Sequence, residues 1–100
     1  MFYKSHFPKS GSREAIEKEA CEEGFNPILI KDPPGFIYKS HKHRETKFLA
    51  CLEGSMQVIV ENQKYVFEPG DKLIIPSNTQ HSAVVGKDGC TFYWSETLKD

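Results

Sequence analysis

The sequence contains few cysteines, no large excess of positive or negative charge, and no long apolar run. Its three cysteines, Cys21, Cys51 and Cys90, lie far apart and form no CxxC pair, so a structural zinc site made of thiolates is not expected. Lysine and arginine number 13 against 14 acidic residues, which gives no electrostatic case for nucleic acid or an anionic membrane as a partner. No apolar run approaches the roughly 20 residues of a membrane span.

The N-terminus, MFYKSHFPKSGSRE, also lacks the apolar segment of a signal peptide. Together with the odd number of cysteines, this predicts a cytoplasmic protein with reduced thiols. The 100 residues correspond to one domain. A hydrophobic content of 38% and a charged content of 27% are typical of a folded globular protein.

One short helix is expected ahead of a series of strands. Ser12 can cap a helix over residues 13–23, with Gly24 just past its end and Ile16 and Ala20 on one face. From residue 26 on, short apolar runs alternate with Gly, Pro and Asn. The expected strands are 36–43, 47–52, 56–61, 64–67, 72–75, 81–85 and 91–95. This pattern predicts an all-β sandwich or barrel over 26–100, preceded by an arm and helix over 1–25.

Two histidines, His41 and His43, stand two residues apart in one expected strand. Their side chains would leave the same face and could chelate one ion. An HxH pair taken alone is more often a surface or packing feature. A third histidine, His81, follows a glycine turn at Gly70, an apolar strand and a turn that begins at Pro76.

With these residues in place, the sequence resembles the cupin family. The first cupin motif is a glycine, an HxH pair, a glutamate and a second glycine at set spacings, and it is matched by Gly35, His41, His43 and Gly54. The second motif is matched by Gly70, Pro76 and His81. Asn78 replaces the glycine of that motif, a mild change because asparagine tolerates the left-handed backbone conformation.

The resemblance implies a jelly-roll β-barrel of two antiparallel sheets. It also implies that His41, His43 and His81 converge on one divalent transition metal, either Fe, Mn, Ni, Cu or Zn. The alternative is a degenerate cupin whose three histidines line a ligand pocket without metal. Small cupins commonly bury their sheet edges against a partner, so a homodimer is expected, with the aromatic N-terminal arm as a strand across the interface.

The glutamate of the first motif falls on Lys47. A protonated lysine has no lone pair and cannot bind a metal. Three interpretations stay open. In the first, Glu45 replaces the missing ligand. In the second, the site has three histidines and open positions, which is similar to the thiol dioxygenases of the family, and Lys47 binds a substrate carboxylate; in the third, Lys47 points outward and pairs with Glu45 or Glu53. We expect Lys47 to face the cavity, with Glu45 or a bound anion offsetting its charge.

Two classes of function fit these residues. One is a metal-dependent dioxygenase or isomerase acting on a small polar or anionic molecule, with Lys47 as the candidate catalytic residue. The other is a non-catalytic module that binds or senses a small ligand or a metal, because the fold hosts both classes. Candidates for the lining of the barrel are Tyr38, Leu49, Cys51, Val58, Val60, Phe67 and Tyr93, and Phe92 and Trp94 are expected in the core or a dimer contact.

Overall fold

The structure is a computed structural model and describes residues 1–9 and 13–97. One helix, α1 (Arg13–Glu22), accompanies antiparallel strands at β1 (Phe2–Tyr3), β2 (Ile28–Asp32), β3 (Ile37–His41), β4 (Thr46–Val60), β5 (Gln63–Phe67), β6 (Lys72–Ile75) and β7 (His81–Thr97). The helix ends one residue earlier than expected. The proposed cap, Ser12, lies outside the described residues.

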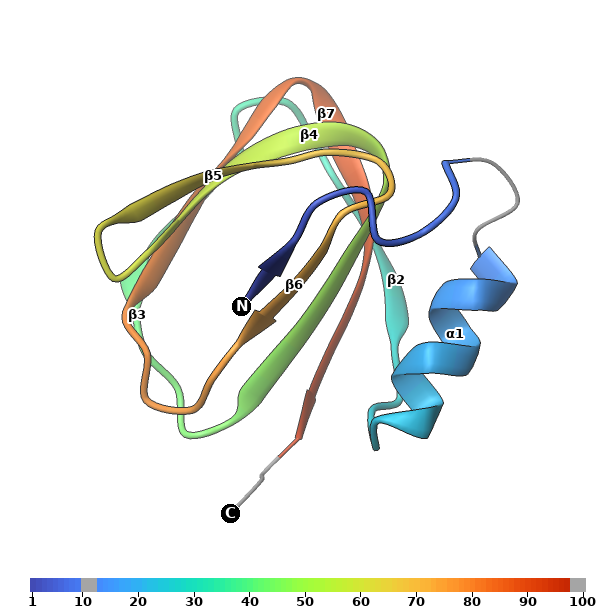
Figure 1. Ribbon diagram of the computed structural model, residues 1–100. Helices are drawn as coiled ribbons and strands as arrows, with labels where there is room; N and C mark the ends of the chain where they lie inside the picture. Colours follow the sequence, from blue (N-terminus) through green and yellow to red (C-terminus); the bar gives the residue numbers. More distant parts are fainter. Residues whose placement is uncertain (10–12, 98–100) are drawn as a thin grey trace.

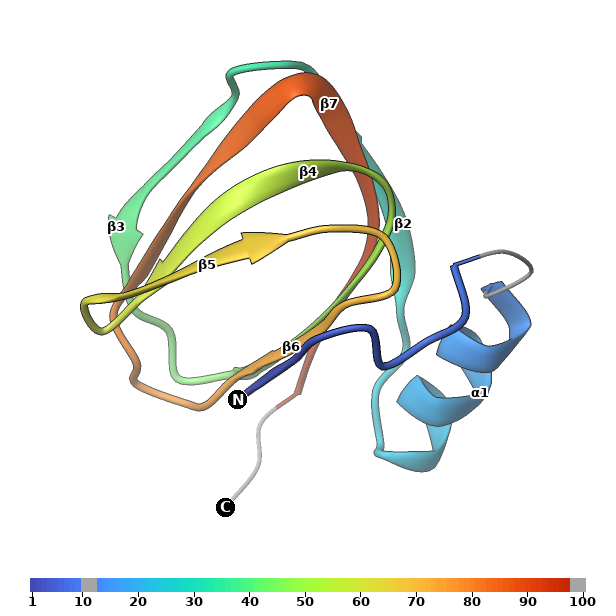
Figure 2. The ribbon, with the colours of Figure 1, turned by 45° about the horizontal axis from the view of Figure 1, so that its top comes forward.

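Two long strands, β4 and β7, pair along their whole length and take part in both layers of a barrel. The first half of β4 and the second half of β7 belong to a sheet of order β1-β6-β4-β7-β2. Their other halves are flanked by β5 and β3. Figure 1 and Figure 2 show these strands wrapped around one interior. The predicted all-β jelly-roll fold is thereby confirmed.

The expected strand breaks at residues 53–54 and 86–89 are bends within β4 and β7. At Gly54 the backbone has a φ of 73°, and a Cβ atom there would lie 2.0 Å from the carbonyl oxygen of Gly89. Only glycine allows the two strands to approach this closely. Bulges on either side of Gly54 turn the ladder from one sheet into the other. The prediction of separate strands was therefore wrong, because the glycines bend the chain without ending its pairing.

Helix α1 covers the outer face of the first sheet, beside β2 in Figure 1. Its buried residues, Ile16 and Ala20, pack in a cluster with Phe7, Phe25, Phe48, Ala50 and Tyr93. Tyr93 therefore faces the helix, and its expected place in the lining of the barrel was wrong. Among the described residues, no helix has the length and apolar character to cross a membrane.

The N-terminal arm adds its strand to its own chain. Phe2 of β1 is paired with Leu73 of β6, and the backbone of Met1 continues this contact with Ile74. The arm is thus an edge strand of the first sheet, and the expected strand across a dimer interface stays a prediction.

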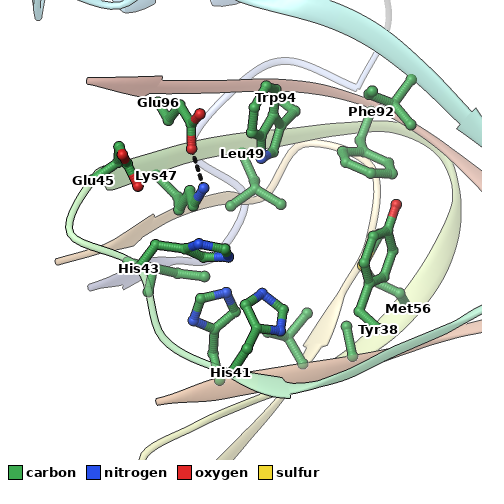
Figure 3. Close-up of a pocket in the computed structure, with 15 residues that line it drawn as sticks. Tyr38, His41, His43, Glu45, Lys47, Leu49, Met56, Phe92, Trp94 and Glu96 are labelled. Atoms are coloured by element: carbon green, nitrogen blue, oxygen red, sulfur yellow. Dashed lines mark hydrogen bonds and ion pairs between the residues drawn. The ribbon is translucent and has the colours of Figure 1, made fainter. Parts of the chain in front are cut away.

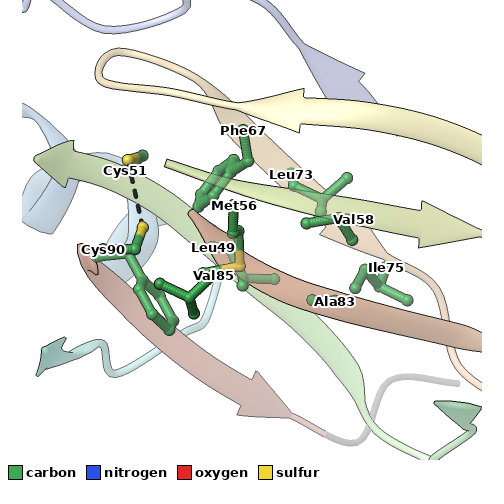
Figure 4. Packing of buried hydrophobic residues seen from close by; sticks show 11 residues of the cluster. Leu49, Cys51, Met56, Val58, Phe67, Leu73, Ile75, Ala83, Val85 and Cys90 are labelled. Carbon is green, nitrogen blue, oxygen red and sulfur yellow. Dashed lines mark hydrogen bonds between the residues drawn. The ribbon is translucent and has the colours of Figure 1, made fainter. Parts of the chain in front are cut away.

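A second cluster of buried residues lies between the two sheets, and Figure 4 shows its packing. Cys51 and Cys90 lie within it with their Sγ atoms 3.7 Å apart and joined by a hydrogen bond. The neighbouring Cys90 thiol, followed by burial, raises the pKa of Cys51. The Cys51 thiol is therefore held neutral, and both buried cysteines pack as small apolar side chains.

Candidate metal site

The fold brings the two histidine segments to one place. His41 is the last residue of β3 and pairs with His81, the first residue of β7. His43 follows in the loop before β4, so it leaves a loop and not the strand that was expected. The N–H of Asn78 donates a hydrogen bond of 2.6 Å to the carbonyl oxygen of His43 and ties the two loops together. Asn78 has a φ of 57°, which confirms the left-handed conformation predicted for it.

The three histidine side chains form a compact cluster. One ring nitrogen from each of His41, His43 and His81 lies within 4.8 Å of the others. The ring of His41 is 4.4 Å from each of the other two, centroid to centroid. Nitrogen ligands at about 2.1 Å from one ion stand about 3.0–3.4 Å apart. Modest rotations of the rings would therefore close the cluster around a single ion.

Backbone carbonyl groups orient two of these rings. The Nδ1 of His81 donates a hydrogen bond of 2.9 Å to the carbonyl oxygen of Thr79. The Nδ1 of His41 donates to the carbonyl oxygen of Lys39. A neutral imidazole with its proton held on Nδ1 has a free lone pair on Nε2, which is the usual state of a metal-binding histidine.

The surroundings of His43 and His81 favour neutral rings. Burial lowers the pKa of His81; the hydrogen bond to Thr79 opposes this effect, and the charges of His41, His43 and Lys47 add to it. Burial also lowers the pKa of His43, followed by the charge of Lys47. Because a histidine must be unprotonated to bind a metal, these shifts suit the donor set to a transition-metal ion.

Lys47 lies beside the three histidines, at the start of β4, with only 5% of its surface exposed. Its ammonium group donates a hydrogen bond to the carboxylate of Glu96 on the neighbouring strand β7. Its Nζ also lies 5.1 Å from the centre of the Trp94 ring. Figure 3 shows Lys47 and Glu96 above His41 and His43. Lys47 thus faces the cavity, but its charge is offset by Glu96 and not by the expected Glu45.

Glu45 lines the same pocket but does not join the histidine cluster. In Figure 3 its carboxylate lies on the far side of Lys47 from His41. Within the part of the chain that the structure describes, the only group of side chains that could together hold a metal ion is formed by the three histidines.

The pocket behind these residues has a volume of about 620 Å³. Its polar side chains are the three histidines, Glu45, Lys47, Glu96 and Tyr38, and the remainder are apolar: Ile30, Leu49, Met56, Val58, Ile75, Ala83, Phe92 and Trp94. Tyr38 donates its hydroxyl proton to Asp32. Burial, followed by this hydrogen bond, raises the pKa of Tyr38 and keeps the phenol protonated.

Glu96 is the functional candidate that the sequence did not reveal. It lies outside both histidine motifs, and it reaches Lys47 only because β7 pairs with β4 in the register Lys47↔Glu96. Trp94 shares its face of β7, two residues away, and also lines the pocket. The alternation of β7 was a partial signal, since it groups residues 92, 94 and 96 on one side of a strand but does not say which side faces the pocket.

Comparison with known proteins agrees with this geometry. The sequence model of the cupin domain family matches residues 28–95. The chain therefore belongs to the cupin family. The solved structure of KdgF from Halomonas sp. has the same fold, with a TM-score of 0.65 at 24% identity over 76% of this chain and 71% of that chain.

Two curated proteins are similar in sequence. A dimethylsulfoniopropionate lyase, DddW, from Ruegeria pomeroyi is 32% identical over 59 residues, which cover 59% of this chain and 39% of the relative. A quercetin 2,3-dioxygenase from Bacillus subtilis is 36% identical over 59 residues, which cover 58% of this chain and 18% of the relative. The chain thus spans less than two-thirds of either relative.

Proposed function

We propose that this member of the cupin family binds one divalent transition metal through His41, His43 and His81 and is a metal-dependent enzyme. The observation that carries the proposal is the convergence of three ring nitrogens within 4.8 Å at the wall of a pocket of about 620 Å³. Three protein ligands leave coordination positions open for a substrate or water. Fe, Mn, Ni, Cu and Zn all suit such imidazole ligands.

The substrate that we propose is a small molecule with one carboxylate. The charged side chains that line the pocket are one lysine and two glutamates, namely Lys47, Glu45 and Glu96. A divalent ion beside them would leave an excess of one positive charge, which a singly charged anion balances. A lysine ammonium can donate three hydrogen bonds. Among the described residues, Lys47 donates to Glu96 alone, so it retains donors for a carboxylate in the pocket.

The metal would supply Lewis-acid or oxygen chemistry to a substrate held beside it. The protein's own contribution would be to bind and orient that substrate. Lys47 would fix its carboxylate, and the apolar walls would limit the access of water. The names of the two similar proteins, a lyase and a dioxygenase, support an enzyme over the alternative of a non-catalytic binding module.

A screen for turnover tests the enzyme directly. The Fe(II)- and Mn(II)-loaded protein would be mixed aerobically with thiols, diketones, flavonols and small carboxylates, with oxygen uptake and ¹H NMR as readouts. We expect one of these classes to be converted only by metal-loaded protein, and more slowly by a Lys47→Met variant. Binding without any conversion, with either metal, would contradict the enzyme and favour the binding module.

The homodimer and the cytoplasmic location remain predictions. Light scattering at micromolar concentration decides the first, and a monomer mass would refute it. Fractionation of the native cells decides the second.

A further inference from the structure

The pocket has two chemically different halves. The histidines, Lys47 and Glu96 lie at one end, and Figure 3 shows Met56, Phe92 and Tyr38 at the other end. The polar end is partly exposed to solvent, and 37% of the Glu96 side chain is accessible. The opposite end is enclosed between the two sheets.

The apolar half is defined here by Tyr38, Leu49, Met56, Val58, Ala83 and Phe92. Val58 and Tyr38 both pair with Ala83, so these three form one row across β4, β7 and β3. Leu49 and Phe92 come from the first sheet and face this row. Exposure of the aliphatic members and Phe92 is only 2–9%. This surface is therefore shielded from bulk water although it borders the pocket.

Water is a poor occupant for this half. A buried water needs two to four polar partners. The single polar group among the six residues is the Tyr38 hydroxyl, and its proton is donated to Asp32. Hydrocarbon, in contrast, gains from contact with these walls.

We propose that the ligand of this pocket is an amphipathic monocarboxylate, with its carboxylate at the Lys47 end and a hydrocarbon body in the apolar half. This inference rests on the proposed function for the position of the carboxylate. It narrows the substrate class, because a compact diacid or a sugar would leave the apolar half without a partner. Of the two ligand features, the hydrocarbon body sets affinity and the carboxylate sets orientation.

Straight-chain carboxylates of increasing length test the proposal. Butyrate, hexanoate and octanoate would be titrated into Zn(II)-loaded protein, because zinc has no redox chemistry and no substrate turnover is needed. Trp94 is the single tryptophan of the chain, it lines the pocket and it lies beside Lys47, so its fluorescence reports occupancy. We expect affinity to rise about fourfold per added methylene, since burying one methylene is worth ~0.8 kcal/mol. Affinity that changes less than twofold over the whole series would overturn the inference.

A filling substitution locates the site. Ala83→Leu would occupy the apolar half and should abolish the dependence on chain length while zinc content stays unchanged. Val58→Met, across the ladder from Ala83, is a second filling variant should the first fail to fold. Val84→Leu is the matched control, because Val84 is the next residue of β7 and is 47% exposed on the outer face. Equal chain-length dependence in the filled and control variants would place binding elsewhere and contradict the proposal.

The design separates this inference from the proposed function. The carboxylate is constant through the series, so the slope with chain length reports only on the apolar half. If the chain takes up no zinc, the proposed function fails, and n-alcohols of the same lengths in metal-free protein test the apolar half by themselves. Alcohols whose affinity is independent of length would then overturn the inference as well.

Discussion

Two buried lysines occupy opposite faces of the first sheet and differ in what surrounds them. Lys72 and Lys47 are each 5% exposed. Lys72 lies on the outer face and donates hydrogen bonds of 2.6 Å to Glu19 and 2.7 Å to Glu23. Lys47 lies on the inner face and donates to Glu96, beside the pocket. Both Nζ atoms also lie over an aromatic ring, at 5.2 Å for Lys72 and Tyr3.

The difference shows how burial of the same residue type can serve structure or function. Lys72 joins the helix to the sheet through two carboxylates, and His6 adds a further contact to Glu19. Burial alone would lower the pKa of Lys72, but the hydrogen bonds to Glu19 and Glu23 outweigh it and raise the pKa. On the inner face, Lys47 has a single carboxylate and an open pocket. The outer network is therefore expected to govern stability, and the inner one ligand binding.

The largest effect is expected from the inner histidines. Replacing His41 by Ala removes one of three proposed ligands and should weaken zinc affinity at least about 100-fold. His6→Ala is the matched control, because His6 belongs to the outer network and lies outside the cluster. Competition with a chromophoric chelator measures both affinities. Equal losses of zinc affinity in the two variants would contradict the different roles assigned to the inner and outer faces.

Lys72→Met should destabilise the fold by about 1–3 kcal/mol, since it leaves the Glu19 and Glu23 carboxylates without their shared cation. This loss of stability stays below that for a fully buried ion pair, because the side chains of Glu19 and Glu23 are 28% and 36% exposed. Lys47→Met should cost less than about 1 kcal/mol, because Glu96 can be hydrated. Urea denaturation compares the two. A larger loss for Lys47→Met would reverse the assignment of structural and functional roles.

Lys47 substitutions should change metal affinity according to the charge that they introduce. Lys47→Glu supplies the carboxylate of the first cupin motif and should tighten metal binding about tenfold, or ~1.4 kcal/mol. Lys47→Met should leave the affinity unchanged or slightly higher, because it removes a repulsive charge. Isothermal titration with Zn(II) separates these cases. Loss of the metal in Lys47→Met would mean that Lys47 acts as a neutral ligand or a structural anchor.

The smallest expected effect is on the dependence of folding stability on pH. Burial would raise the pKa of Glu19, but hydrogen bonds from Lys72 and His6 outweigh it and hold the pKa below its ordinary value of 4.5. A carboxylate with a lowered pKa in the folded state contributes stability above its unfolded pKa, and this is lost as pH falls through the folded pKa. Stability should therefore fall below about pH 4.5, with a shallower slope in Lys72→Met. An unchanged slope would show that the outer network does not act through Glu19.

The motif spacing was sufficient to place the histidines, Lys47 and the left-handed Asn78. These positions are fixed by local features, namely glycine turns, an apolar strand and the count of residues to Gly54. Glu96 was missed because its contact with Lys47 depends on the register of two strands 49 residues apart. Nothing in the local sequence encodes that register.

Two further features of the fold could not be predicted, because the sequence pattern allows more than one interpretation. Phe92, Tyr93 and Trp94 are consecutive aromatic residues, so alternation could not tell which side faces the pocket and which faces the helix. The glycines at 54, 86 and 89 read as strand ends. In the structure they are bends, because β4 and β7 stay paired through the turn from one sheet to the other.

Metal content is the most direct test of the central claim that His41, His43 and His81 form one metal site. Elemental analysis of the purified protein would be compared with that of a variant in which all three are replaced by Ala, and with His6→Ala. We predict one divalent transition-metal ion per chain in the wild type and in His6→Ala, and none in the triple variant. A triple variant that folds and retains stoichiometric metal would contradict the assignment.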